Sequence, residues 1–456
     1  MDRVNLCVLQ RYPHRFLPLI VLPGKSFNRI PTNAQWNRFK KRARGMRELR
    51  VHSNADLIAA DVPSTLQLRN GNDQFLPRLE TFACLDTSEA FIPLIPLFLH
   101  RQTANIVITF SANVPVVMMA STIAQLPVIS PNLRQLVLSV LPKDPVIVEA
   151  ASEMLLACSP DSLEEFMVYS PLTEEACRVL YNLPNLRTLR TIVRGPTPLP
   201  PLTLPSLTTI RVSYDDRHNW LRGFHGATLG SLLSVSFSAR PASIGPFLED
   251  FKSAALTSSI QNTLSSFEFL TQRPWNPDYS SLLVFKQLTR LVIEFSCSAG
   301  CSSGVDDDVV TSLAHAMPKL EVLYLGGQPC QATTGITLKG LVTLACRCPK
   351  LSKLRVHFRV REWVEVANNL ELPVLSAQAT IIPKTSCALT CLQVGETPIL
   401  ERDIFAVALI LVQVFPQINS VLFIGRRWEA VEEYIRLIKQ IGSCVDYHMG
   451  QLHIRS

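Results

Sequence analysis

A ten-residue phrase that recurs along the chain constrains its fold more than any other feature. MPKLEVLYLG (317–326) and CPKLSKLRVH (348–357) lie about thirty residues apart and share the pattern Pro-x-Leu-x-x-Leu-x-apolar. The last two apolar positions are two residues apart, so their side chains point to one face of a short strand. One strand cannot bury that face alone, whereas stacked copies share a continuous core. The phrase therefore predicts stacked repeats.

Alignment on the first Leu of the phrase finds it along nearly the whole chain, with NIVITF (105–110) as a degenerate copy in the one long gap. The aligned anchors are Leu49, Leu79, Leu133, Leu163, Leu186, Leu207, Leu232, Leu264, Leu288, Leu320, Leu351, Leu389 and Ile418. Their mean spacing is about 28 residues, inside the leucine-rich-repeat range of roughly 20 to 29. An ordinary α/β sheet would not repeat one phrase at a fixed offset in this way.

The segments between the phrases predict helices, because neighbouring parallel strands need a crossover. Apolar residues recur at three- and four-residue spacing, and several segments begin with an acid or Thr and end at Pro. The segments are 144–160, 173–184, 306–318, 337–349 and 401–416. The sequence thus predicts an α/β leucine-rich-repeat solenoid of about 13–14 irregular repeats. A curved parallel sheet would form its concave side and helices its convex side.

Three regions are predicted. Residues 1–45 form a non-repeat segment with a basic helix, 46–425 form the solenoid, and 426–456 form a capping helix and tail. In the basic helix, Trp36, Phe39 and Ala43 are expected to pack on the first repeat. Its charged side chains indicate a solvated face, or alternatively a nuclear-import or phosphate-binding patch. The Pro-rich stretch 194–205 predicts a crossover in extended chain.

Charge and cysteine content exclude several classes of protein. A formal net charge of +7 over 456 residues is mildly basic and does not indicate nucleic acid. The 12 cysteines are irregularly spaced, which favours reduced, mostly buried thiols over a disulfide framework. The N-terminus is a poor secretion signal, and the longest apolar run, 404–415, is too short to span a bilayer. We therefore expect a cytoplasmic or nuclear protein that does not bind a membrane.

The sequence contains no motif that carries chemistry. It lacks a Gly-x-Ser-x-Gly elbow, a His-Glu-x-x-His pair and a Walker-type loop. Two Cys-x-x-x-Cys pairs (297/301 and 387/391) have no further ligands at zinc-site spacing, and the acidic YDDRHNW stretch (214–220) is typical of a solvated loop. We expect no enzyme, no cofactor and no catalytic or metal-ligating residue.

What remains is a surface for binding. In each strand, the residue between the last two apolar positions points away from the core. Two small clusters of Arg, Tyr and His occupy these outward positions, and Arg and Tyr are enriched at binding hot spots. The predicted concave-face contact residues are Arg190, Arg211, Tyr324, Arg355 and His357. A generic polar face is the alternative.

Four stretches resemble the F-box/leucine-rich-repeat proteins that are numerous in mushroom-forming fungi. They are QWNRFKKRARGMRELRV (35–51), PLPPLTLPSLTTIRVS (198–213), LACRCPKLSKLRV (344–356) and RRWEAVEEYIRLI (426–438). The resemblance implies the substrate-recognition part of a ubiquitin-ligase receptor, which binds a protein substrate on its concave face and is joined to the ligase by a Skp-type adaptor.

The chain departs from this family at its N-terminus. No pattern for a three-helix F-box is present in residues 1–31, so an adaptor is expected only if an F-box lies upstream or is cryptic. A stand-alone repeat scaffold without a ligase link is the alternative. An enzyme and a nucleic-acid binder are less consistent with the residues.

Overall fold

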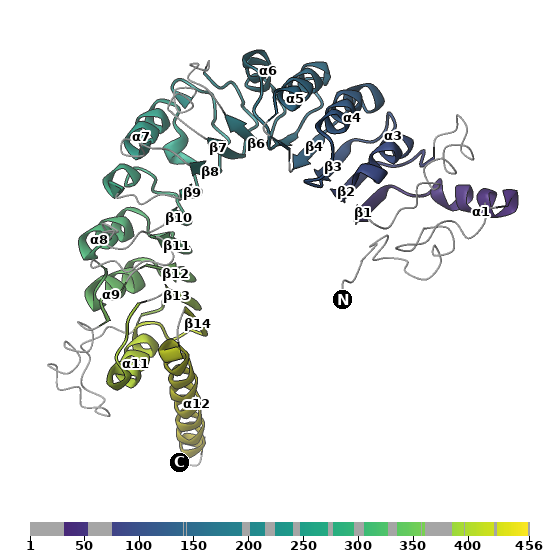
Figure 1. The fold of residues 1–456 in the computed structure, drawn as a ribbon. Coiled ribbons are helices and arrows are strands. Elements are labelled where there is room, and N and C mark those ends of the chain that lie inside the picture. The colour runs from purple at the N-terminus through teal and green to yellow at the C-terminus, as the bar shows by residue number, and fades with distance from the viewer. Residues whose placement is uncertain are drawn as a thin grey trace. The chain divides into compact units, whose positions relative to one another are not determined.

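The computed structural model describes most of the chain. The described residues are 32–52, 75–139, 141–142, 144–193, 201–214, 224–239, 247–271, 277–295, 305–326, 335–356, 358–360, 385–395, 397–423 and 426–454. They belong to two compact units, which Figure 1 shows in colours that follow the chain. Unit 1 comprises Met1–Ser213 and His218–Ser231, and unit 2 comprises Tyr214–Arg217 and Leu232–Ser456.

Fourteen strands in the described part of the chain follow one another in sequence order. In unit 1 they are β1 (Glu48–His52), β2 (Thr81–Thr87), β3 (Asn105–Phe110), β4 (Gln135–Ser139), β5 (Glu165–Val168), β6 (Thr188–Val193) and β7 (Thr209–Tyr214). In unit 2 they are β8 (Ser234–Ala239), β9 (Ser266–Thr271), β10 (Arg290–Phe295), β11 (Val322–Leu325), β12 (Lys353–Arg355), β13 (Cys391–Gly395) and β14 (Ser420–Phe423). Within units, neighbouring strands pair in parallel. This sheet confirms the predicted α/β repeat fold.

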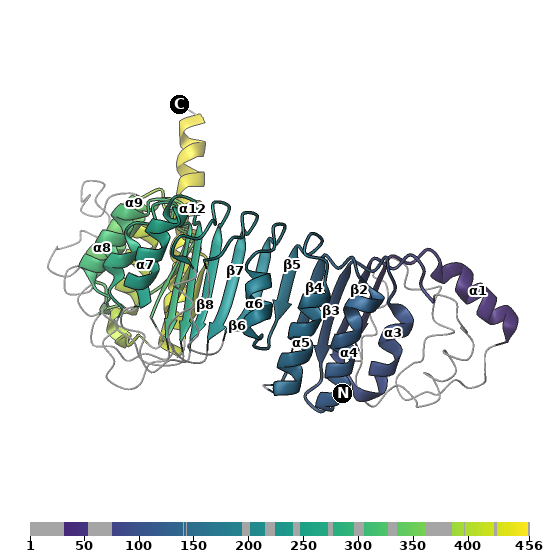
Figure 2. The same cartoon turned by 90° about the horizontal axis from the view of Figure 1, so that it is seen from above.

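Helices connect most of the strands. In unit 1 they are α1 (Asn33–Ala43), η2 (Glu89–Leu94), α3 (Ile95–Phe98), α4 (Val116–Ile129), α5 (Pro145–Ala157) and α6 (Glu174–Leu180). In unit 2 they are α7 (Phe247–Thr257), η4 (Ile260–Asn262), η5 (Tyr279–Leu282), α8 (Asp307–Ala316), α9 (Leu338–Arg347), η6 (Glu401–Asp403), α11 (Ile404–Val414) and α12 (Arg426–Ile454). All five predicted helical segments contain a helix. Figures 1 and 2 show that the connecting helices of each unit cover one face of its strands; we call the opposite face the open face.

The anchors of the phrase lie in the core, with two differences from the sequence alignment. Leu49 lies inside β1 and pairs with Phe82, so the true equivalent of Leu79 is Met46, three residues earlier. In the degenerate copy the anchor position is occupied by Thr103, which is fully buried. Its hydroxyl donates a hydrogen bond of 3.1 Å to the carbonyl oxygen of Leu79. A buried polar group is tolerated there because it is hydrogen-bonded.

A repeated backbone contact aligns successive strands. The carbonyl oxygen of Arg47 accepts hydrogen bonds from the amides of Glu80 (2.8 Å) and Thr81 (3.0 Å), just before and at the start of β2. The same double contact recurs in unit 2, where the Thr289 carbonyl accepts from Glu321 (2.7 Å) and Val322 (3.0 Å). Because each strand begins at the same height as its neighbour, residues at equal positions in successive strands form straight rows.

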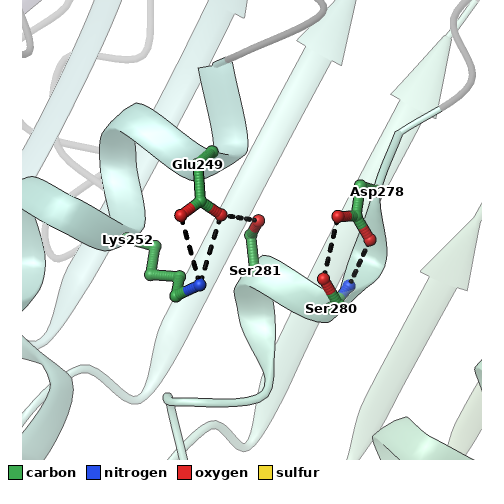
Figure 3. Close-up of polar contacts among 5 residues, drawn as sticks. All are labelled: Glu249, Lys252, Asp278, Ser280 and Ser281. Atoms are coloured by element: carbon green, nitrogen blue, oxygen red, sulfur yellow. Dashed lines mark hydrogen bonds and ion pairs between the residues drawn. The ribbon is translucent and has the colours of Figure 1, made fainter.

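On the helical side, short polar contacts tie consecutive repeats together (Figure 3). Glu249 in α7 accepts a hydrogen bond of 2.7 Å from the hydroxyl of Ser281 in η5 and lies 3.2 Å from the Lys252 ammonium. The Ser281 bond, followed by Lys252, lowers the pKa of the Glu249 carboxyl. Asp278 caps η5 through the amide (2.9 Å) and hydroxyl (2.8 Å) of Ser280, and these bonds lower its pKa in the same way.

Helices also stand at both ends of the described chain. In α1, Trp36 and Ala43 are buried, and the Trp36 ring lies 5.7 Å from that of Phe75; the side chain of Phe39 lies outside the described residues. In α12, the buried Trp428 donates from its indole nitrogen to the Thr397 carbonyl at 2.7 Å. The predicted division into 1–45, 46–425 and 426–456 stays a prediction.

Other sequence predictions are covered only in part. Residues 201–205 of the Pro-rich stretch contain no helix, and Thr203 forms an isolated bridge with Thr228. Residues 194–200 lie outside the described part, as does most of 214–220. Of the described helices, none has the length and apolar character that a membrane span requires.

Candidate functional site

The open face presents one straight row of side chains in each unit. The row consists of the third residue of each strand, which is the outward position that the phrase predicts. In unit 1 the aligned residues are Arg50, Ala83, Val107, Val137, Met167 and Arg190. In unit 2 they are Ser236, Glu268, Val292, Tyr324, Arg355, Gln393 and Leu422. Of the predicted contact residues, Arg190, Arg211, Tyr324 and Arg355 are each the third residue of a strand, whereas His357 lies outside the described residues.

Arg190 is held in place by a tyrosine. The guanidinium Nη1 donates a hydrogen bond of 2.9 Å to the hydroxyl of Tyr169, which follows β5. The guanidinium carbon also lies 6.0 Å from the centroid of the Tyr169 ring, within the range of a cation–π contact. Neither of these two contacts involves a carboxylate. A partner would meet a cation that is already oriented.

Arg211 stands level with Arg190 on the next strand. The amides of Thr208 and Thr209 both donate to the carbonyl of Arg187, at 2.9 and 3.0 Å, which is the contact that aligns strands elsewhere. Arg211 is exposed. Neighbouring strands lie about 5 Å apart, so the predicted pair of arginines is on adjacent strands at one height.

In the second cluster, in unit 2, the side chains contact one another directly and include residues that the sequence did not assign to the cluster. The guanidinium carbon of Arg355 lies 4.6 Å from the centroid of the Tyr324 ring. Arg355 also forms an ion pair with Glu294 of β10, two strands away. The side-chain amide of Gln393, on β13, donates a hydrogen bond of 3.2 Å to the Tyr324 hydroxyl. Burial is the main cause that raises the pKa of the Tyr324 phenol, so it stays protonated.

These contacts give Arg355 a supporting position. Its side chain is 14% exposed and that of Glu294 39% exposed, so the arginine is largely covered and its charge is already matched by a carboxylate. Glu294 and Gln393 were both recognisable as outward positions, but nothing in the sequence indicates that they join Tyr324 and Arg355. His357, the third predicted member of this cluster, lies outside the described residues.

Between the arginines of unit 1, the row is apolar. Ala83 is buried, and Val107, Val137 and Met167 are half-buried although they lie on the open face. The neighbouring row, two residues earlier in each strand, is polar: Asn105 donates to the Thr81 hydroxyl at 3.0 Å, and Gln135 donates to Glu165 at 2.7 Å. The surface therefore offers an apolar strip that ends at the cation of Arg190.

A hollow of about 540 Å³ lies where β3, β4 and β5 begin. It is lined by Glu80, Arg101, Gln102, Ala104, Asn105, Asn132, Arg134, Gln135, Glu164 and Glu165. Glu80 forms an ion pair with Arg47 at 3.1 Å, and Glu165 accepts the hydrogen bond from Gln135. No histidine is among the residues that line the hollow.

The cysteines of the described region are free thiols, most of them buried. The thiol of Cys387 donates to the carbonyls of Cys348 (3.7 Å) and Leu351 (3.5 Å), and burial raises its pKa to about 11. A protonated, hydrogen-bonded thiol neither attacks a substrate nor binds a metal. Across the described residues, no three His, Cys, Asp or Glu side chains are grouped closely enough to hold a metal ion.

No family model matches the chain, and no curated protein sequence matches it. Among solved structures, it is similar to a chain in the crystal structure of the Rad7 and Elc1 complex in yeast, with a TM-score of 0.35 and 14% sequence identity. The match covers 64% of this chain and 80% of that chain. A likeness this distant carries no argument about function.

Proposed function

We propose that this chain is a non-enzymatic protein-interaction module that binds a protein ligand on its open face. The observation that carries the proposal is the pair of Arg–Tyr contacts at row positions, Arg190 on Tyr169 and Arg355 on Tyr324. Side chains that are ordered before binding lose little conformational entropy on binding. Aromatic and arginine side chains in such positions are typical anchors of protein interfaces.

In unit 1, the chemistry of the surface favours a particular kind of ligand. An apolar strip that leads to an oriented guanidinium suits a segment with apolar side chains followed by a carboxylate or a phosphate. Arginine binds both anions with paired hydrogen bonds. The contact residues that we propose are Arg190, Arg211 and Tyr324, with Arg355 in a positioning role.

A finer form of the proposal is that the chain acts as the substrate-recognition part of an F-box-type ubiquitin-ligase receptor, in the cytoplasm or nucleus. Its support is the sequence resemblance of the four stretches described above. The alternative is a repeat scaffold with no ligase link. The first experiment is co-expression with a Skp-type adaptor: co-purification supports the receptor, and its absence favours the scaffold.

The ligand surface is tested separately. Once a partner is captured, its dissociation constant is compared for the wild type and for Arg190→Glu, which we expect to weaken binding by about 10-fold or more. Arg78→Glu is the matched control, because Arg78 is an exposed arginine of the same unit in the turn before β2, outside the row. Equal affinity of the wild type and Arg190→Glu would refute the assignment of this surface. Equal loss in both variants would show that only net charge matters.

A further inference from the structure

The C-terminal helix has two apolar stripes, and only one of them is covered. Trp428, Val431 and Ile435 are buried against the last repeat. On another side of α12, Tyr434, Leu437 and Ile441 are 39%, 45% and 64% exposed. Helices that cap repeat arrays normally turn a polar face outward, since that face ends the core. The second stripe therefore needs an explanation.

The neighbouring helix extends this apolar surface. Phe405 of α11 is 49% exposed, and its ring meets that of Tyr434 edge-on with centroids 5.6 Å apart. The α11 segment IFAVALILVQV is apolar except for the exposed Gln413, a composition typical of a helix that is largely buried. We call Phe405, Tyr434, Leu437 and Ile441 the terminal patch. Contiguous exposed apolar surface of this kind marks an interaction site.

The spacing of the patch residues indicates that a helix covers the terminal patch. Tyr434, Leu437 and Ile441 are separated by three and then four residues, which is the alternation of core positions in paired helices. Such a stripe packs against another helix that carries the same spacing. A second copy of α12 supplies that helix, and a patch that meets its own copy forms a closed two-fold interface.

The charges beside the stripe are compatible with such a pair. Glu433 and Arg436 are both exposed and lie on successive turns, so the rim has both signs and two copies do not repel each other there. In an antiparallel pair centred on Leu437, Glu433 of one copy lies near Gln440 of the other, which allows hydrogen bonds across the rim. We infer that the chain forms a two-fold dimer through α12 and α11, with the terminal patch as its core.

The dimer is tested on the full chain by sedimentation equilibrium from about 1 to about 100 µM, a range that brackets micromolar affinity. We expect twice the chain mass for the wild type at the upper concentrations. Leu437→Glu with Ile441→Glu places two charges in the apolar core, and should weaken dimerisation by about 100-fold or more. Val117→Glu with Val128→Glu is the matched control, because both valines are exposed on α4 and the charge change is the same.

The outcomes separate clearly. A wild type that is monomeric throughout overturns the inference, and so does a dimer that survives the α12 change or that the α4 change disrupts equally. If the glutamate pair lowers the melting temperature, Leu437→Ala with Ile441→Ala replaces it. A second test uses Leu437→Cys in a background in which both Cys346 and Cys444, the native cysteine of α12, are replaced by Ser, with Val128→Cys as control. Only the α12 cysteine should form a disulfide-linked dimer, because bridging needs Cα atoms within about 7 Å.

Discussion

His100 illustrates how one buried side chain can be held in a single protonation state. Its Nδ1 accepts a hydrogen bond of 3.0 Å from the Gln102 amide, and its Nε2 lies 2.6 Å from the Leu76 carbonyl oxygen and 3.1 Å from the Leu79 amide nitrogen. A second proton on Nδ1 would face the Gln102 N–H. Burial is the main cause that lowers the pKa of His100, and the neutral ring is therefore the folded form.

We predict that this histidine makes stability depend on pH. Below the unfolded pKa of about 6.5, the unfolded chain binds a proton that the folded chain does not, so stability falls as the pH drops toward the lowered folded value. The free energy of urea unfolding should decline from pH 7.5 to 5 by a greater amount in the wild type than in His100→Gln, whose side chain does not titrate. Parallel curves for the two proteins would contradict this prediction.

Among the elements, α8 and α9 show how the start of one helix supports the start of the next. Asp306 caps α8 by accepting from the Asp308 and Val309 amides, at 3.1 and 3.0 Å. Asp307 then reaches the next repeat and accepts from the amide (2.8 Å) and hydroxyl (2.5 Å) of Thr337. Thr337 is itself the cap of α9. The acidic run favours the helix start, as the sequence predicts, and one of its carboxylates joins two repeats.

This arrangement reverses the usual effect of replacing a glycine in a helix. Alanine normally stabilises a helix interior by about 1 kcal/mol relative to glycine. A Cβ on Gly340 of α9 would lie 2.4 Å from an oxygen of Asp307, whose position the Thr337 bonds fix. We predict that Gly340→Ala destabilises the wild type by about 1–3 kcal/mol.

In an Asp307→Ala background the carboxylate is gone and only the Cβ of Ile336, at 3.3 Å, remains close, so Gly340→Ala should be far less destabilising there than in the wild type. Asp307→Ala alone should cost about 2 kcal/mol, because it leaves the Thr337 donors without the carboxylate. A double-mutant cycle from thermal or urea unfolding measures the coupling. Additive effects of the two substitutions would show that Asp307 and Gly340 do not meet.

At the scale of the whole molecule, we expect each repeat to be stabilised by contacts with the repeats on either side of it. Trp428 is among the largest fully buried side chains, and replacing it with Ala should cost about 3–5 kcal/mol by loss of packing. Repeats contact mainly their neighbours, so we predict that Trp428→Ala speeds amide hydrogen exchange in β13 and β14 first, while β2 to β5 keep their protection. Uniform acceleration along the chain would indicate one cooperative unit instead.

The sequence by itself determined the repeat fold, because a row of Leu anchors such as Leu320 and Leu351 is a local pattern that each strand must bury in the same way. It also located α5, α6, α8, α9 and α11, because their spacing and caps depend on residues within a few turns, whereas α4 and α7 were not among the predicted segments. The sequence alignment chose Leu49 wrongly because the anchor position of that one repeat is occupied by Met46, where most other repeats have Leu. Thr103 was not foreseeable as an anchor, because its hydroxyl is satisfied by a carbonyl 24 residues away.

Only the tertiary structure decided how the outward side chains are combined. The sequence placed Tyr324 and Arg355 on adjacent strands, but the Glu294 carboxylate that matches the arginine comes from two strands away, and Tyr169 meets Arg190 from beyond the end of β5. The exposure of the second stripe of α12 could not be predicted either. A helix sequence shows which residues are apolar, but it does not show which of them a neighbouring element covers. Periodicity is a property of the chain, whereas contacts between repeats depend on register and burial that exist only in the folded protein.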